Sequence, residues 1–129
     1  MFARDIMTKD IITVSPKTTV RNLALILIKN RISGAPVAGK NGKIVGVVSE
    51  ADIVTKKGKD VKSIMSKKVI SVMEETTVEE IAQLMTTHVV KRLPVMNGEK
   101  IVGIVSRADI VSAIALGTHV ALHTPIYDL

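Results

Sequence analysis

The stretch GVVSEADIV at residues 46–54 recurs, with two changes, as GIVSRADIV at residues 103–111. In both copies an apolar run that begins with glycine ends at a serine, and an aspartate follows three positions later. A serine with an acidic residue at the third position after it is typical of the start of a helix. Each copy therefore predicts a strand that turns into a helix at the serine.

The similarity between the two copies extends over most of the chain. Further matches precede these stretches in the same order: Asp5-Ile6-Met7 with Ser63-Ile64-Met65, Ile12-Thr13-Val14 with Ile70-Ser71-Val72, Thr18-Thr19-Val20 with Thr76-Thr77-Val78, and Pro36-Val37 with Pro94-Val95. Repeats in a fixed order indicate an internal duplication. We expect one repeat over residues 1–58, a second over residues 59–117, and a C-terminal tail over residues 118–129.

Each repeat predicts five elements in the order strand, helix, strand, strand, helix. In the first repeat we expect strands over residues 11–14, 35–38 and 44–48, with a tight turn at Asn41-Gly42. Helices are expected from Thr19 to about Arg31 and from Glu50 onward, while Thr77 and Glu80 form a capping box in the second repeat. The fold class is therefore α+β, with two α/β-type β-α-β-β-α repeats. We expect them to pack about a pseudo-twofold axis, because each alone is small for a stable core.

The apolar stripes of the first helix in each repeat predict which faces are buried. Positions three and four apart share one face of a helix. The expected buried residues are Val20, Leu23, Ala24, Leu27 and Ile28 in the first repeat, and Val78, Ile81, Ala82 and Met85 in the second. The matched positions of Met7 and Met65 also indicate packing.

Composition excludes several classes of protein. Hydrophobic residues make up 47% of the 129 residues and aromatic residues only 2%, so the core is expected to be aliphatic. The absence of cysteine excludes disulfides, thiolate metal sites and a cysteine nucleophile. The longest apolar run, at residues 23–28, is too short to cross a bilayer, and the start of the chain does not resemble a signal peptide. We expect a soluble cytoplasmic protein without a membrane partner.

The formal net charge of +6 favours anionic partners. The excess is concentrated mid-chain, around Gly58, at Lys56, Lys57, Lys59, Lys62, Lys67 and Lys68. The simplest interpretation is a solvated linker. Nucleic-acid binding is an alternative, although no aromatic residues alternate with these lysines to stack on bases.

The duplicated pattern resembles the cystathionine β-synthase (CBS) domain family, as a tandem pair or Bateman module. The resemblance rests on the order of the motifs, from Asp-Ile-Met to Gly-x-x-Ser-x-x-Asp, and covers nearly all of residues 3–116. It implies binding of AMP, ADP or ATP, or in some members S-adenosylmethionine or NAD, in a cleft between the repeats. It also implies a homodimer of the pair and a regulated partner protein of unknown identity, with no required cofactor.

The resemblance also assigns roles to residues. Ser49 and Ser106 are expected to hold phosphate, where helix amides and the helix dipole favour an anion. Asp52 and Asp109 are expected to bind ribose hydroxyls. The adenine slot comprises Ile12, Thr13, Ala35 and Pro36 in the first repeat, and Ile70, Ser71, Leu93 and Pro94 in the second. The glycines Gly46 and Gly103 admit a close approach of backbone or ligand.

The two sites are expected to differ in charge. The second repeat carries Arg107, Lys91 and Arg92, and arginine suits bidentate phosphate contacts. The first repeat has Glu50 in place of Arg107, which repels a phosphate. The Asp109 site should therefore bind anionic nucleotides better than the Asp52 site. Alternatively, Arg92 reaches across the shared cleft to the ligand at Asp52, and the sequence leaves both possibilities open.

Catalysis is not expected from this sequence. Neither serine has a histidine placed beside it, and the phosphate loops of P-loop and Rossmann proteins are absent. His119 and His123 have a spacing that suits a metal on a helix, but no carboxylate joins them. Three functions remain: a nucleotide sensor, a nucleic-acid-binding protein, and a structural dimer or adaptor with vestigial sites.

Overall fold

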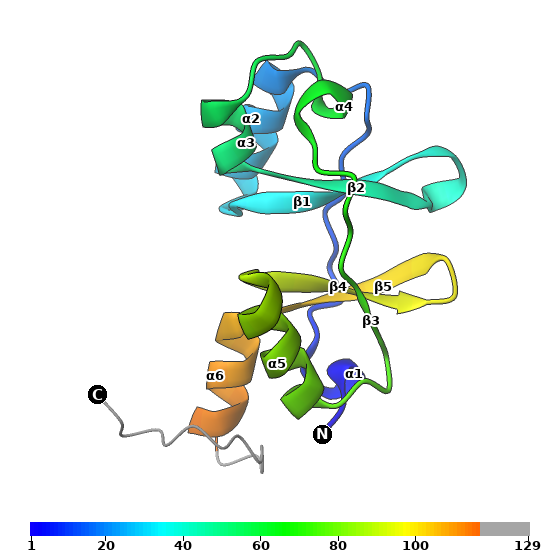
Figure 1. Ribbon diagram of the computed structural model, residues 1–129, viewed down its shortest axis with the longest axis vertical. Coiled ribbons are helices and arrows are strands. Elements are labelled where there is room, and N and C mark those ends of the chain that lie inside the picture. The colour runs from blue at the N-terminus through cyan, green and yellow to red at the C-terminus, as the bar shows by residue number, and fades with distance from the viewer. Residues whose placement is uncertain (117–129) are drawn as a thin grey trace. The chain divides into compact units, whose positions relative to one another are not determined.

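A computed structural model describes residues 1–116, which form two compact units (Figure 1). We call them the Asp52 unit, which comprises residues 11–70 and 98–101, and the Asp109 unit, which comprises residues 1–10, 71–97 and the described residues from 102. Both units contain helices and strands. The predicted α+β class is confirmed.

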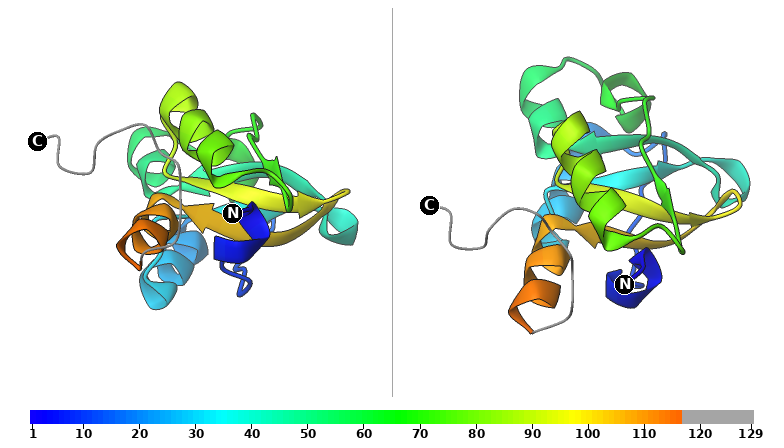
Figure 2. Two further views of the ribbon diagram at one scale, coloured as in Figure 1. Left: turned by 90° about the horizontal axis from the view of Figure 1, so that it is seen from below. Right: turned by 60° about the horizontal axis from the view of Figure 1, so that its bottom comes forward.

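The Asp52 unit is built on one antiparallel hairpin. Its elements are α2 (Val20–Asn30), β1 (Gly34–Ala38), the short 3-10 helix η1 (Lys40–Gly42), β2 (Ile44–Ser49), α3 (Glu50–Thr55) and α4 (Val61–Ile64). Gly34 lies opposite Ser49 in the ladder, so the base of the hairpin is the point where β2 turns into α3. The turn of the hairpin projects from the other end (Figure 2). Asn41 and Gly42 both have left-handed backbones there, with φ of 61° and 73°, as the expected tight turn requires.

Helix α2 buries a narrower face than the sequence indicates. The Thr19 side chain accepts a hydrogen bond from the Asn22 amide at 3.1 Å, which confirms Thr19 as the N-cap. Leu23 and Leu27 are buried in the core of this unit, but Ile28 is 75% exposed, so its expected burial is wrong. Ile26 packs against the core instead. It lies three positions after Leu23, whereas Ile28 is turned about 100° from Leu27.

The strand expected over residues 11–14 is reduced to one bridge. Val14 pairs in parallel with Val37, and its amide donates to the Pro36 carbonyl at 3.1 Å. The flanking side chains of Thr13 and Ser15 are exposed, so only Val14 has a burial reason to join the sheet. This prediction is therefore wrong for the residues before Val14.

The Asp109 unit has a three-stranded sheet. Its elements are α1 (Ala3–Ile6), β3 (Val72–Met73), α5 (Val78–His88), β4 (Arg92–Asn97), β5 (Lys100–Ser106, from residue 102 onward) and α6 (Arg107–Ala115). The strands lie in the order β3-β4-β5, and β3 runs parallel to β4. The stripe of α5 is confirmed by the burial of Val78, Ile81 and Met85. The Thr77 side chain accepts from the Glu80 amide at 3.2 Å, which is the Thr77 half of the expected capping box.

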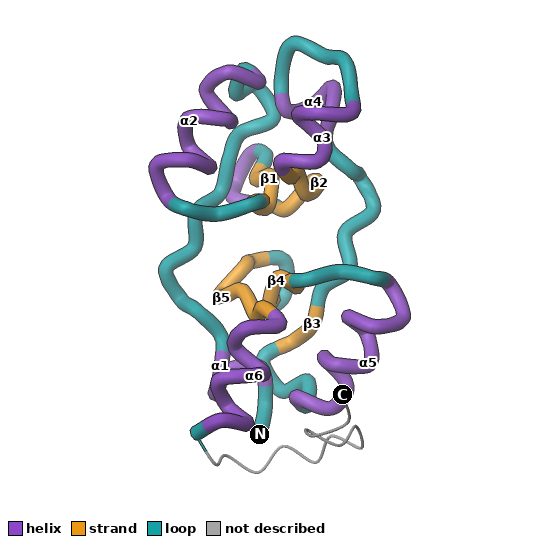
Figure 3. Tube along the Cα trace, turned by 90° about the vertical axis from the view of Figure 1, so that its left-hand side faces the viewer, coloured by secondary structure: helices purple, strands orange, loops and turns teal. Residues whose placement is uncertain are grey.

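The packing units do not coincide with the sequence repeats. Helix α1, from the start of the chain, belongs to the Asp109 unit, where the Ala3 amide donates to the Thr76 carbonyl at 2.8 Å. Helix α4, which opens the second repeat, belongs to the Asp52 unit, where Val47 and Ser66 form a bridge just after it (Figure 3). Each unit thus takes its capping segment from the start of the other repeat.

Candidate functional site

The corner between β5 and α6 is held by a reciprocal pair of hydrogen bonds. The Ser106 amide donates to Oδ2 of Asp109 at 2.7 Å, and the Asp109 amide donates to the Ser106 hydroxyl at 3.2 Å. This arrangement is a capping box with aspartate in place of glutamate. The helix cap expected at Ser106 is confirmed, and it fixes the orientation of the half-buried Asp109 carboxylate.

Two backbone amides at each corner, that of the serine and that of the next residue, are hydrogen-bonded within the protein. The Arg107 amide donates to the Lys91 carbonyl at 2.9 Å, and the Glu50 amide donates to the Ser33 carbonyl at 2.9 Å. The serine amides are bonded to the two aspartates. The expectation that the helix amides near the serines are open to a phosphate is therefore wrong at these two positions of each corner. These bonds join the base of each hairpin to the start of its helix.

The Asp52 corner engages both oxygens of its carboxylate. Oδ2 accepts from the Ser49 amide at 2.9 Å and from the Ser49 hydroxyl at 3.3 Å. Oδ1 lies 2.8 Å from Nζ of Lys56, and the same Nζ donates to the Ile64 carbonyl at 3.0 Å. Lys56 therefore links α3 to the end of α4.

Lys56 is a site residue that the sequence interpretation missed. The net-charge pattern groups it with the lysines of a solvated linker, although a spacing of four residues from Asp52 is a signal for an ion pair on a helix. The corresponding position in the second repeat is Ala113, which is buried in the Asp109 unit. Within residues 1–116, Oδ1 of Asp109 has no hydrogen-bond or ion-pair partner.

The residues expected to line the adenine slots fall into two groups. Ala35, Pro36, Leu93 and Pro94 are buried, and Ala35 and Leu93 belong to the cores of their units. The residues from the preceding segments are more accessible: Thr13 and Ser71 are exposed, and Ile12 and Ile70 are half-buried. Ile70 is grouped with the Asp52 unit, although Ser71 belongs to the other.

The charged residues of the second repeat gather near the Asp109 corner. The Arg107–Lys91 backbone bond places these two residues side by side, and both are exposed. Arg92 follows Lys91 as the half-buried first residue of β4. The first repeat has the exposed Glu50 in place of Arg107.

The matched glycine before each corner allows close packing within the protein. A Cβ at Gly46 would lie 2.7 Å from the Ser66 carbonyl oxygen and 2.8 Å from Sδ of Met65. At Gly103 it would lie 2.5 Å from Sδ of Met7. The two methionines thus cover matched glycines, which confirms their packing role.

Metal and membrane features can be stated for the described residues. Residues 1–116 contain no group of three histidine, cysteine, aspartate or glutamate side chains that could hold a metal ion. His119 and His123 lie outside the described residues. Within residues 1–116, no helix combines the length and the hydrophobicity needed to span a membrane.

Two copies of one family model match the chain. The CBS domain model matches residues 3–58 and 61–116, so the chain belongs to the CBS domain family and carries two of these domains in tandem. This confirms the family that the sequence motifs resemble.

Solved structures share this fold. CBSX2, solved in complex with AMP, is 28% identical with a TM-score of 0.84, and the match covers 92% of this chain and 98% of that one. The CBS domain pair of protein MJ0100, solved with 5-methylthioadenosine and S-adenosyl-L-methionine, is 29% identical with a TM-score of 0.83, over 92% and 98%.

Among curated relatives, the inosine-5'-monophosphate dehydrogenase of Methanocaldococcus jannaschii is 36% identical over 111 residues. The match covers 84% of this chain but only 22% of the dehydrogenase. The chain therefore spans about a fifth of that relative's length.

Proposed function

We propose that this chain is a regulatory module that binds an adenine nucleotide, and that its own affinity for a partner protein changes when the nucleotide is bound. The observation that carries the proposal is the Asp109 corner. A helix cap orients its carboxylate, and Oδ1 has no partner among residues 1–116. An ionised carboxylate accepts hydrogen bonds readily, and the two hydroxyls of a ribose are suitable donors. The structures solved with AMP and with S-adenosyl-L-methionine support this choice of ligand.

The remaining contacts of the ligand follow from exposure and charge. Arg107, Lys91 and Arg92 would neutralise the phosphates of AMP, ADP or ATP through their side chains, since the amides of Ser106 and Arg107 are already bonded. Ser71, which is exposed, is proposed to contact the base together with Ile70, Leu93 and Pro94. In the first repeat the corresponding set is Ser49, Asp52, Ile12, Thr13, Ala35 and Pro36. S-adenosylmethionine and NAD carry the same adenosine group and remain within the proposal.

The proposed mechanism is a shift in the equilibrium between two conformations of the tandem pair. A ligand favours the conformation that it binds more tightly. Its effect on the binding of a partner cannot exceed the difference between its affinities for the two conformations. Such couplings are typically about 1–3 kcal/mol. The proposal assigns binding and regulation to this chain and no catalysis, because the dehydrogenase relative is matched over only 22% of its length.

Calorimetric titration of the full chain with AMP tests the proposal. Asp109→Asn should weaken binding about tenfold or more, because the ribose loses a charged acceptor. The asparagine oxygen can still accept from the Ser106 amide, so the helix cap should survive. Asp52→Asn is the matched control and should weaken binding less. Failure of AMP, ATP and S-adenosylmethionine to bind the wild-type chain would remove the basis of the proposal.

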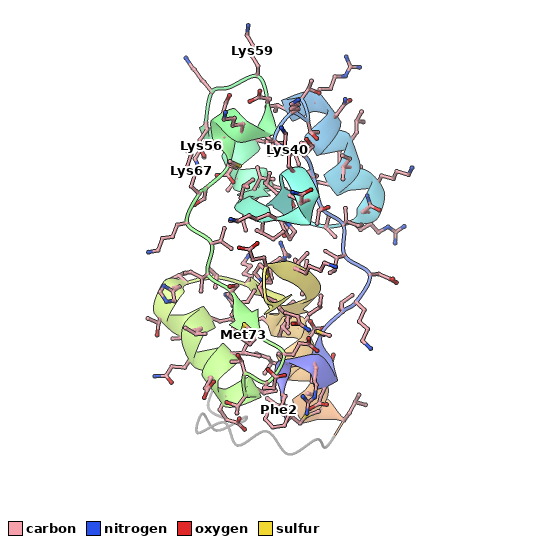
Figure 4. All side chains as sticks on the ribbon, turned by 90° about the vertical axis from the view of Figure 1, so that its right-hand side faces the viewer. Phe2, Lys40, Lys56, Lys59, Lys67 and Met73 are labelled. Atoms are coloured by element: carbon pink, nitrogen blue, oxygen red, sulfur yellow. The ribbon has the colours of Figure 1, made fainter. Side chains whose placement is uncertain are left out.

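Nucleic-acid binding is the second candidate, favoured by five exposed lysines of the Asp52 unit: Lys57, Lys59, Lys62, Lys67 and Lys68. Lys59 extends away from this unit (Figure 4). Binding through phosphates alone would show as retention on DNA that falls steeply with salt. Retention that persists at physiological salt, without nucleotide binding, would favour this candidate.

The proposal also includes a homodimer and a cytoplasmic location. Apolar side chains on α2 and α3 support an interface between copies, since Leu25 is 55%, Ile28 75% and Val54 82% exposed. Large exposed apolar side chains are candidates for burial in an interaction surface. The cytoplasmic location rests on the cysteine-free sequence, which suits a reducing compartment.

A further inference from the structure

We propose that Lys56 competes with nucleotide for the Asp52 carboxylate, so that the first corner is self-occupied while the Asp109 corner is open. This inference rests on the proposed function, because it assumes that these carboxylates bind ribose. It identifies Lys56 as a residue of the chain itself that makes the two sites differ in nucleotide affinity.

The contacts of Lys56 leave Asp52 without a free oxygen. Nζ of Lys56 lies 2.8 Å from Oδ1, while Oδ2 accepts from the Ser49 amide and hydroxyl. The Asp52 side chain is 16% exposed, whereas that of Lys56 is 45% exposed. The lysine ammonium group therefore contacts a carboxylate that has little solvent exposure of its own, and a ribose hydroxyl would have to compete with it for Oδ1.

Three bonds hold Lys56 in this position. Its backbone amide donates to the Asp52 carbonyl at 3.1 Å and ends α3 there. Its ammonium group bonds both the Asp52 carboxylate and the Ile64 carbonyl. A charged donor shared between two acceptors in a partly buried place is stronger than a solvated surface pair.

The second repeat lacks this arrangement. Ala113 takes the place of Lys56, and α6 continues past it to Ala115. Ala113 is buried and has no group that could reach Asp109. The two corners share the serine and the aspartate. They differ in whether a cationic side chain contacts Oδ1 of the aspartate.

Competition by Lys56 and simple charge attraction predict opposite changes in nucleotide affinity when the lysine is removed. Removing a lysine ordinarily weakens the binding of an anionic nucleotide. If Lys56 competes for Asp52, its removal should instead strengthen binding at the first corner. Uncharged adenosine separates the two effects, because it carries the ribose without a phosphate.

The test uses the full chain with Asp109→Asn, so that titration reports mainly on the first corner. Addition of Lys56→Met, which keeps the apolar part of the side chain, should tighten the binding of both AMP and adenosine about tenfold. Lys56→Ala is the second variant, and thermal melts confirm that both fold. Lys57→Met is the matched control: it removes the same charge next in sequence and should give no gain with adenosine.

The outcomes separate this inference from the function on which it rests. If the wild-type chain binds AMP and Asp109→Asn weakens it, but both Lys56 variants bind adenosine no better than their background, the competition is refuted and the function stands. If Lys57→Met increases the affinity for adenosine as much as the Lys56 variants do, the competition is also refuted. If neither the wild-type chain nor the Lys56 variants bind AMP or adenosine, the proposed function itself fails.

Discussion

At the scale of single residues, the two matched glycines face different neighbours. An alanine Cβ at Gly46 would meet the Ser66 carbonyl oxygen at 2.7 Å, and that oxygen already accepts from the Val47 amide. At Gly103 every close atom belongs to the Met7 side chain, which can rotate. Gly46→Ala should therefore lower the free energy of unfolding by about 1–3 kcal/mol, and Gly103→Ala by less. Denaturant titration measures both values, and a larger loss for Gly103→Ala would contradict this account.

The sequence predicts the residues of each corner better than their partners. Ser106 and Asp109 are three positions apart, so their capping box depends only on local backbone geometry. The sequence predicts a close approach of other atoms to Gly46. It does not predict that Met65 and Ser66 are the residues that make this contact. Such contacts depend on how the chain returns after α3. The pairing of Lys56 with Asp52 was accessible from their spacing, whereas its bond to the Ile64 carbonyl required the position of α4.

At the scale of elements, the cap of α5 is open to a direct test. The Thr77 hydroxyl satisfies the Glu80 amide at the start of the helix. Thr77→Ala removes this acceptor and should destabilise the chain by about 1 kcal/mol. Thr77→Ser keeps the hydroxyl and should cost much less, as measured by denaturant unfolding. Equal losses for the two variants would mean that the threonine methyl group, rather than the cap, matters here.

The cap of α4 predicts a pH dependence. A hydrogen bond from the Ser63 hydroxyl, at 2.7 Å, and one from the Ser63 amide lower the pKa of Asp60 below its ordinary value of 3.8. Since the folded pKa lies below the unfolded one, the cap stabilises α4 above about pH 4 and is lost as pH falls through the folded value. An NMR titration of the Asp60 carboxyl should give a midpoint below 3.8. Ser63→Ala should raise that midpoint, and an unchanged one would contradict the assignment.

Elements with strong local signals were predicted, and those that depend on distant pairing were not. Both long helices begin at the expected threonine, because a hydroxyl cap and an apolar stripe are written in neighbouring residues. The expected strand over residues 11–14 forms only at Val14, since its pairing depends on the distant Val37. Short apolar segments of this kind carry no information about their partner strand.

At the scale of the whole molecule, duplication was readable but the exchange of segments was not. Matching residues define two repeats without reference to packing. The contacts of Ala3 with Thr76, and of Val47 with Ser66, join residues from different repeats within one unit. Each exchanged helix is only four residues long, too short to indicate from its own pattern which core it covers.

The exposed apolar surface of the Asp52 unit leads to a prediction about assembly. Ile28 and Val54 are 75% and 82% exposed, and burial of such side chains contributes about 1.5–3 kcal/mol each. If α2 and α3 form the homodimer interface, Ile28→Glu and Val54→Glu should each shift the chain toward its monomer mass of 13.9 kDa in light scattering. Asn22→Glu is the control, because it adds the same charge at an exposed polar position of α2 and should leave assembly unchanged. A dimer that survives both apolar substitutions would exclude this surface as the interface, since a glutamate buried there without a partner would be costly.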